Sequence, residues 1–281
     1  MGAFSVSILL ALGASVAYGA ADFSGGLVSK RTSSLGVVLL GHAFSLLFLL
    51  PLALLLGEPF PTLPNLLFGM LAGLSGGFGL IILYKALAEG QMSLASPVSA
   101  LVAAALPVLV GLWLDGLPGP LMLLGFTLAL LAIWLIANTG TISLSNVYKQ
   151  LRLPFISGIF FGLFFIGMNR ASGDAVIWPI IATRLGSIPG LLIYSTIVRL
   201  KWMPAGRNWS RILLVSLLDT LGNICFIFSS QLGRLDLAAV ISSLYPASTV
   251  ALAWLVLKER MIASQWLGVL CALLALVFIS L

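Results

Sequence analysis

Apolar runs as long as a bilayer is thick follow one another along nearly the whole chain. A membrane-spanning helix needs about 20 apolar residues, and ten runs of that order fall near residues 4–28, 35–57, 64–88, 93–114, 119–138, 154–172, 175–198, 209–231, 235–257 and 262–281. They are rich in leucine and alanine, and the strict alternation of a barrel strand is absent. The sequence therefore predicts an all-α membrane protein with ten transmembrane helices.

The composition excludes a soluble protein and explains the positive charge. Hydrophobic residues make up 60% of the chain and charged residues 8%, which is far from the balance of a soluble domain. The formal net charge is +6, but the basic residues lie in short loops between apolar runs, so we expect no nucleic-acid partner. The first run lacks a basic segment before it and is interpreted as a span, not as a cleaved signal peptide.

Lysine and arginine are unevenly divided between the two sets of loops. The loops after the odd-numbered runs hold Lys30, Arg31, Lys85, Lys149, Arg152, Arg199, Lys201, Arg207, Arg211, Lys258 and Arg260, whereas the opposite loops hold only Arg170 and Arg234. Because basic loops stay in the cytoplasm, both termini are predicted on the non-cytoplasmic side of a bacterial-type plasma (inner) membrane. One extra or missed span would invert part of this multi-pass topology.

The chain also contains an internal repeat. Residues 66–138 align without a gap to residues 209–281 at a constant offset of 143, and about 20 of the 73 pairs are identical. The matches include three glycine pairs, Gly79 with Gly222, Gly90 with Gly233 and Gly125 with Gly268. Five spans per copy is an odd number, so the second copy must enter the membrane from the opposite side. The polar segment 139–153 is predicted to be a cytoplasmic linker between repeats at 1–138 and 154–281.

The C-terminal segment resembles a known family. The stretch SSLYPASTVALAWLVLKERMIASQWLGVLCALLALVFIS, from Ser242 to Ser280, is similar to the last two helices of the EamA-type domain in the drug/metabolite transporter (DMT) superfamily. Its marks are the serine-rich stretch before Pro246, the turn at Lys258, Glu259 and Arg260, and the Gln265–Gly268 opening of the last helix. In the first repeat, Asp115, Gly116 and Leu117 replace the charged turn.

The resemblance implies two EamA-like five-helix repeats around a central cavity. Spans 1–4 and 6–9 would line that cavity, and spans 5 and 10 would lie at the periphery. It also implies export of a small molecule, without specifying which, since members of the superfamily move amino acids, nucleotide sugars, triose phosphates, drugs and other metabolites.

Ionisable side chains inside the bilayer are functional candidates because each is costly there unless paired or hydrated. Arg184 and Asp219 lie near the middle of spans 7 and 8, and Asn223 follows Asp219 by one helical turn. They could form a gating or proton-coupled pair, or a structural ion pair that locks two helices together. Asp22 and His42 lie in the inner halves of spans 1 and 2, and could form a second coupling contact or simply pack.

Prolines, serines and aromatic residues complete the candidate site. Pro97 and Pro246 fall in corresponding regions of the two repeats, where broken polar helices would mark a binding site; a static kink is the alternative. The cavity candidates are Tyr18, Tyr84, Ser96, Ser99, Trp178, Arg184, Asp219, Asn223, Ser242 and Tyr245. Cys225 and Cys271 lie inside apolar runs, so neither a disulfide nor a metal site is expected, and no cofactor is predicted.

These features favour a secondary transporter over other classes. The sequence has no Gly-x-x-x-x-Gly-Lys-Ser/Thr phosphate loop, and its one histidine and eight acidic residues are too scattered for an intramembrane enzyme. A passive facilitator or channel remains an alternative. A cavity with few fixed charges suits an amino acid or another small neutral or amphipathic metabolite, because phosphates need several basic partners. Proton coupling and oligomeric state are left open.

Overall fold

The computed structural model describes residues 3–89, 92–114, 116–137, 147–173, 175–200, 208–257 and 262–280. These residues form helices throughout: α1 (Ala3–Ser29), α2 (Ser34–Leu56), α3 (Leu63–Ala88), α4 (Met92–Leu114), α5 (Pro120–Ala137), α6 (Val147–Ser172), α7 (Ile177–Ile197), α8 (Trp209–Leu232), α9 (Leu235–Ser242), α10 (Tyr245–Leu257) and α11 (Ala263–Ser280). The predicted all-α fold is confirmed.

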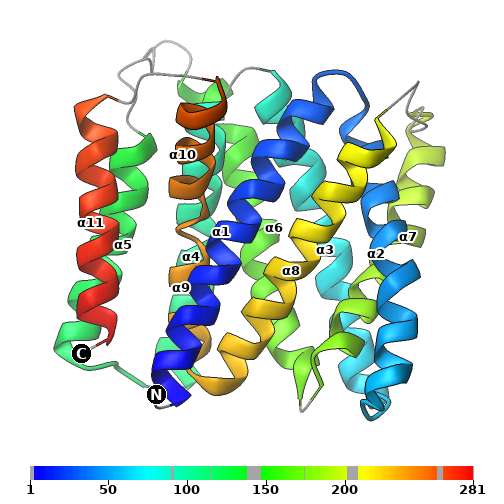
Figure 1. Cartoon of the computed structure of the whole chain (residues 1–281), viewed down its shortest axis with the longest axis horizontal. Helices are drawn as coiled ribbons and strands as arrows, with labels where there is room; N and C mark the ends of the chain where they lie inside the picture. Colours follow the sequence, from blue (N-terminus) through cyan, green and yellow to red (C-terminus); the bar gives the residue numbers. More distant parts are fainter. Residues whose placement is uncertain are drawn as a thin grey trace.

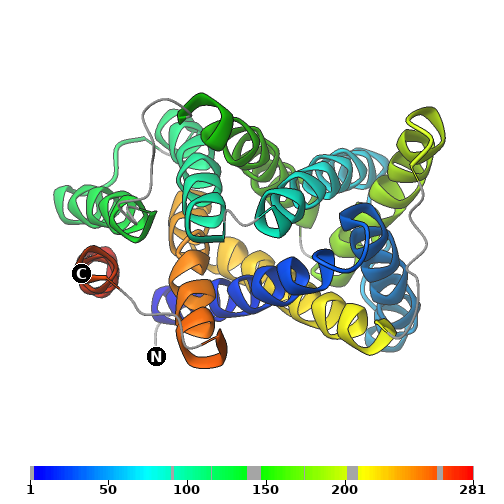
Figure 2. The ribbon, with the colours of Figure 1, turned by 90° about the horizontal axis from the view of Figure 1, so that it is seen from above.

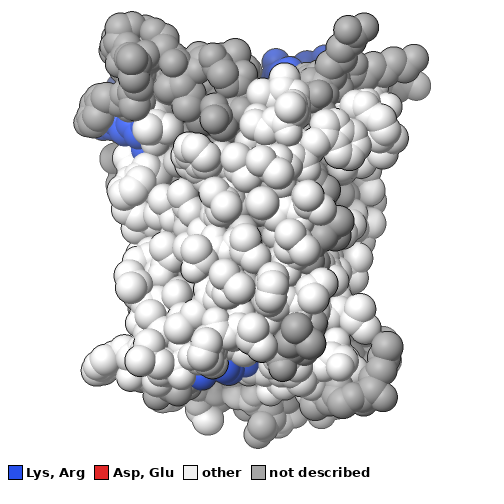
Figure 3. All heavy atoms as spheres, turned by 90° about the vertical axis from the view of Figure 1, so that its left-hand side faces the viewer, with Lys and Arg blue, Asp and Glu red and all other residues white. Residues whose placement is uncertain are grey.

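The helices match the predicted spans. Within the described residues, eight stretches are long and apolar enough to cross a membrane by length and composition, counting α9 and α10 as one. At 1.5 Å per residue, α5 and α11 are shorter, about 27 Å each. Figure 3 shows the flank nearest α5 and α11: Lys and Arg gather at its two ends, and none is seen in the wide band between them.

Local signals set the helix ends between α2 and α3. Gly57 follows α2 with a φ of 64°, and its N–H bonds back to the carbonyl of Leu54, because only glycine adopts this left-handed conformation cheaply. Thr62 then caps α3 by accepting from the N–H of Asn65, with Pro64 in the first turn, where a missing N–H is harmless.

The two prolines that were predicted to break helices behave differently. In the span 235–257, α9 ends at Ser242 and α10 begins at Tyr245, with Pro246 in the first turn of α10. Pro97 was expected to break its helix too, yet α4 continues through both Pro97 and Pro107. A proline opens a new helix without strain, whereas inside a helix it can be absorbed as a bend.

The start of α6 is also earlier than expected. The apolar run was placed at 154–172, but α6 begins at Val147, so the last part of the predicted linker is helical. Residues 139–146 lie outside the described residues, and the linker itself stays a prediction.

The two repeats interlock. α1 packs along α8, and α3 packs along α6, so each copy supplies a partner for a helix of the other. These two pairs correspond under the repeat, with α1 equivalent to α6 and α3 to α8. α5 and α11 pack against each other at one side of the bundle, and both termini lie at the same end (Figures 1 and 2).

Two apolar layers lie at different heights of the bundle. The layer nearer the termini includes Met168, Phe226 and Leu235. The layer nearer the opposite end includes Leu35, Leu87 and Val215.

Candidate solute-binding cavity

A buried ion pair joins α7 to α8. Nη2 of Arg184 lies 2.6 Å from Oδ2 of Asp219, with 3% and 14% of the two side chains exposed. Arg184 also donates through Nε to Oγ of Ser45 on α2, at 3.0 Å. The two ionisable residues predicted for the middle of spans 7 and 8 are therefore in direct contact, and one guanidinium connects three helices.

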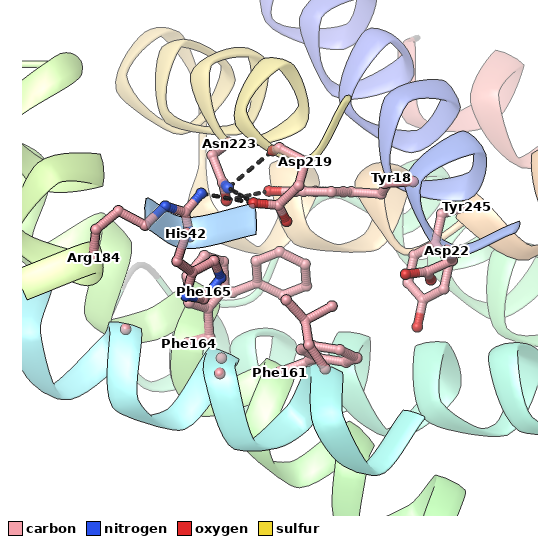
Figure 4. Close-up of a pocket in the computed structure, with 15 residues that line it drawn as sticks. Tyr18, Asp22, His42, Phe161, Phe164, Phe165, Arg184, Asp219, Asn223 and Tyr245 are labelled. Carbon is pink, nitrogen blue, oxygen red and sulfur yellow. Dashed lines mark hydrogen bonds and ion pairs between the residues drawn. The ribbon is translucent and has the colours of Figure 1, made fainter. Parts of the chain in front are cut away.

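The network continues to α1. Nδ2 of Asn223 donates to Oδ2 of Asp219 at 3.1 Å, and the hydroxyl of Tyr18 donates to Oδ1 of Asn223 at 2.9 Å. Figure 4 shows this chain of contacts along one wall of a cavity. Side chains alone thus join four helices: α1 through Tyr18, α8 through Asn223 and Asp219, α7 through Arg184, and α2 through Ser45.

The cavity lies near the middle of the bundle and draws on both repeats. The cavity is small in this structure: about 50 Å³ is open to the centres of water-sized spheres, and about 540 Å³ is free of atoms when its open mouth is included. It is lined by Tyr18, Ala21, Asp22, His42, Gly73, Gly76, Gly77, Leu80, Phe161, Phe164, Phe165, Arg184, Asp219, Asn223 and Tyr245. Seven of the residues singled out in the sequence therefore face one space.

The lining follows the internal repeat. Five pairs of lining residues are separated by the offset of 143: Tyr18 and Phe161, Ala21 and Phe164, Asp22 and Phe165, Gly76 and Asp219, and Leu80 and Asn223. Three of these pairs lie outside the aligned segments 66–138 and 209–281. Equivalent positions of the two copies thus face each other, with acidic and hydrogen-bonding groups on α1 and α8 and apolar groups on α3 and α6.

Glycines on α3 make room for this arrangement. A Cβ atom at Gly76 would lie 2.7 Å from the ring of Phe164, so the aromatic wall of α6 needs a residue without a side chain there. At Gly73 a Cβ would overlap the backbone of Thr183 on α7. Close packing of helices through small residues accounts for both positions.

Asp22 and His42 share the cavity but do not meet. Nδ1 of His42 and Oγ of Ser187 lie 2.7 Å apart, and no hydrogen bond or ion pair to Asp22 is present among the described residues. Figure 4 places the two side chains on different sides of the cavity. Of the two interpretations, a coupling contact or simple packing, the direct contact is not present among the described residues, because a similar depth does not fix the direction in which a side chain points.

Five other candidates lie outside this cavity. Tyr84 lines a smaller adjoining hollow. Ser99 donates to Ser157 at 3.2 Å, and the buried hydroxyls of Ser96 and Ser242 have no partner among the described residues. Trp178 lies at the start of α7, where Nε1 donates to the carbonyl of Glu58 at 3.2 Å.

Two contributions were missed in the sequence. Phe161 lines the cavity at the repeat position of Tyr18, and extending the offset of 143 towards the N-terminus would have found it. Glu58, in the loop after α2, accepts hydrogen bonds from the N–H groups of Val176, Ile177 and Trp178. Its carboxylate caps the N-terminus of α7, the helix that carries Arg184. A cap supplied by a distant loop cannot be recognised from the sequence around the helix.

Comparisons with known proteins agree with this architecture. The model of the EamA-like transporter family matches residues 5–138 and 151–281. A solved structure described as "Crystal structure of protein" superposes with a TM-score of 0.75, covering 98% of this chain and 97% of that chain at 12% sequence identity. At this identity the likeness shows the fold alone. No curated protein matches the chain.

Proposed function

The chain belongs to the EamA-like transporter family, and from that membership we propose that it is a secondary transporter that exports amino acids or other small neutral or amphipathic metabolites by alternating access. Membership also makes it a multi-pass membrane protein that acts on a small molecule. The finer claims, on substrate, direction and mechanism, are the proposal.

The observation that carries the proposal is the position of the cavity. It lies between two interlocked repeats, near the middle of the bundle, and charged side chains that are costly in a membrane line it. Transporters built from inverted repeats bind their solutes at such a place. A purely structural bundle would have no reason to keep Arg184, Asp219 and Asp22 around an open space.

The apolar layers on either side of the cavity support alternating access. On the side of the termini, the rings of Phe165 and Phe226 are 4.6 Å apart, and on the other side Leu35, Leu83 and Leu87 pack together. We infer that the two layers act as seals that open in turn. The Arg184–Asp219 pair would act in gating or coupling, with Asp22 and His42 as further coupling candidates.

The orientation of the protein belongs to the same proposal. The end of the bundle that carries Lys30 and Arg31 would face the cytoplasm of a bacterial-type plasma membrane, and both termini would lie outside. A passive facilitator is the alternative function; it would conduct solute down a gradient through the same cavity.

Counterflow in proteoliposomes tests the proposal. Vesicles preloaded with unlabelled solute would be given labelled leucine, phenylalanine, a hexose phosphate or a nucleotide sugar. We expect saturable uptake of an amino acid that preloading accelerates, with protein-free vesicles as the control. Uptake of phosphates or nucleotide sugars without any amino acid would contradict the proposed substrate. Flux that neither saturates nor responds to preloading would favour the facilitator.

A further inference from the structure

Asp22 is the acidic residue of the cavity that has no counter-charge. It lies on α1, its residue is 5% exposed, and it lines the cavity. Among the described residues, no hydrogen bond or ion pair reaches its carboxyl group, and no dashed line meets it in Figure 4. Asp219, in contrast, is held by Arg184 and Asn223.

The charges of the lining therefore do not balance. Arg184 and Asp219 neutralise each other at 2.6 Å. When it is ionised, Asp22 is one negative charge without a partner among the described residues. A buried carboxylate without a partner is strongly disfavoured in a medium of low polarity, so an entering cationic solute would stabilise the ionised form of Asp22.

We propose that Asp22 determines the specificity of the cavity by binding an ammonium group, so that the solute is an amine-bearing amphipathic molecule. This inference rests on the proposed transport function and narrows its substrate class. It favours amino acids and monoamines, and it disfavours neutral and anionic metabolites.

The rest of the lining fits the body of such a molecule. Phe161, Phe164 and Phe165 form an aromatic wall on α6, which packs against an apolar group and attracts a cation through its ring faces. The repeat position of Asp22 in the second copy is Phe165. The negative charge is therefore present on one side only, and an amine would bind in one orientation.

In this cavity, the carboxylate of a bound amino acid would be held more weakly than its ammonium group. Arg184 already donates Nη2 to Asp219 and Nε to Ser45, so its positive charge is paired with a carboxylate even though other N–H donors of the guanidinium stay open. We therefore expect the ammonium group to be required for binding and the carboxylate to be dispensable.

A binding experiment on the purified full chain tests the assignment without relying on transport. The probe is labelled 2-phenylethylamine, and the competitors are 2-phenylethanol and 3-phenylpropionate, which keep the shape but replace the ammonium group. A hydrogen bond to a charged group is worth enough that both competitors should bind at least about tenfold more weakly than the amine.

Variants locate the effect on Asp22. Asp22→Asn should weaken amine binding by at least about tenfold and reduce the preference over the alcohol, whereas Asp22→Glu should keep the preference. The control is Glu89→Gln, which removes an acidic group at the exposed end of α3, outside the cavity. It should leave amine binding unchanged.

The outcomes are decisive in either direction. Equal binding of amine and alcohol, or a folded Asp22→Asn protein that binds the amine as tightly as the unaltered chain, would overturn the assignment. If Asp22→Asn does not fold, the Asp22→Glu protein and the competitor series decide. Failure of the proposed function looks different: no solute would show counterflow, while amine binding would still depend on Asp22.

Discussion

At the scale of single residues, Arg184 is the side chain on which the site is built. It contacts Asp219 on α8 and Ser45 on α2 while almost fully buried. Removing one partner of a buried ion pair leaves the other charge uncompensated, which costs about 3–5 kcal/mol, whereas replacing both by apolar residues can be nearly neutral.

This asymmetry separates a structural from a functional ion pair. Asp219→Asn should lower the melting temperature of the purified protein clearly, and the double variant Arg184→Leu with Asp219→Leu should recover much of that loss. If the pair takes part in gating, the recovered double variant should still fail to show counterflow. A stable double variant with unaltered counterflow would leave only the structural role.

The sequence located the central residues of the site but not all of their partners. The sequence pointed to Tyr18, Arg184, Asp219 and Asn223 because polar groups inside an apolar run are costly in a membrane unless they have partners. Trp178 and Ser99 do not line this cavity, although Ser99 is fully buried, because an apolar run gives the depth of a residue and not the direction of its side chain. The pattern therefore does not show which face of a helix points inward.

At the scale of helices, Glu58 fixes the N-terminal end of α7. Its carboxylate accepts from three consecutive backbone N–H groups, and Trp178 packs edge-on against Phe60 with ring centroids 4.9 Å apart. Negative charge is favourable at a helix N-terminus, and a cap is worth about 0.5–2 kcal/mol. The contact links the α2–α3 loop of one repeat to α7 of the other.

We expect Glu58→Gln to destabilise the protein by about 1 kcal/mol, because the amide keeps an acceptor but loses the charge. A thermal melt in the same detergent measures it. Glu89→Gln is again the matched control, since Glu89 lies at a helix C-terminus and is exposed. Equal melting temperatures for both variants and the unaltered chain would show that the cap adds nothing.

Helix boundaries were predictable where the signal is local. Gly57 and Pro64 act through their backbone conformation and Thr62 through a side-chain cap, and together they set the end of α2 and the start of α3. The break between α9 and α10 lies next to Pro246, where the sequence predicted a broken helix with a static kink as the alternative. Pro97 and Pro246 look alike in the sequence, and only packing decides which of them starts a new helix.

At the scale of the whole molecule, the orientation in the membrane is open to a direct test. Ser33 and Gly119 are both exposed, at opposite ends of the bundle. In a background with Cys225→Ala and Cys271→Ala, an impermeant maleimide applied to intact cells should label Gly119→Cys and spare Ser33→Cys. The reverse pattern would show that the proposed topology is inverted.

The architecture as a whole was the most predictable part. Two inverted copies of five spans follow from the apolar runs and the constant offset, because both are properties of long stretches and not of single positions. The interlocking of the copies was not predictable, since α1 could equally have packed within its own repeat.

That interlocking also has a consequence for synthesis. α1 ends at Ser29 and its partner α8 begins at Trp209, so the ribosome must add the 179 residues 30–208 between them. During that interval α1 lacks α8, and Tyr18 lacks its hydrogen-bond acceptor on Asn223. The packing of the first half is therefore incomplete until the second half has been inserted into the membrane beside it.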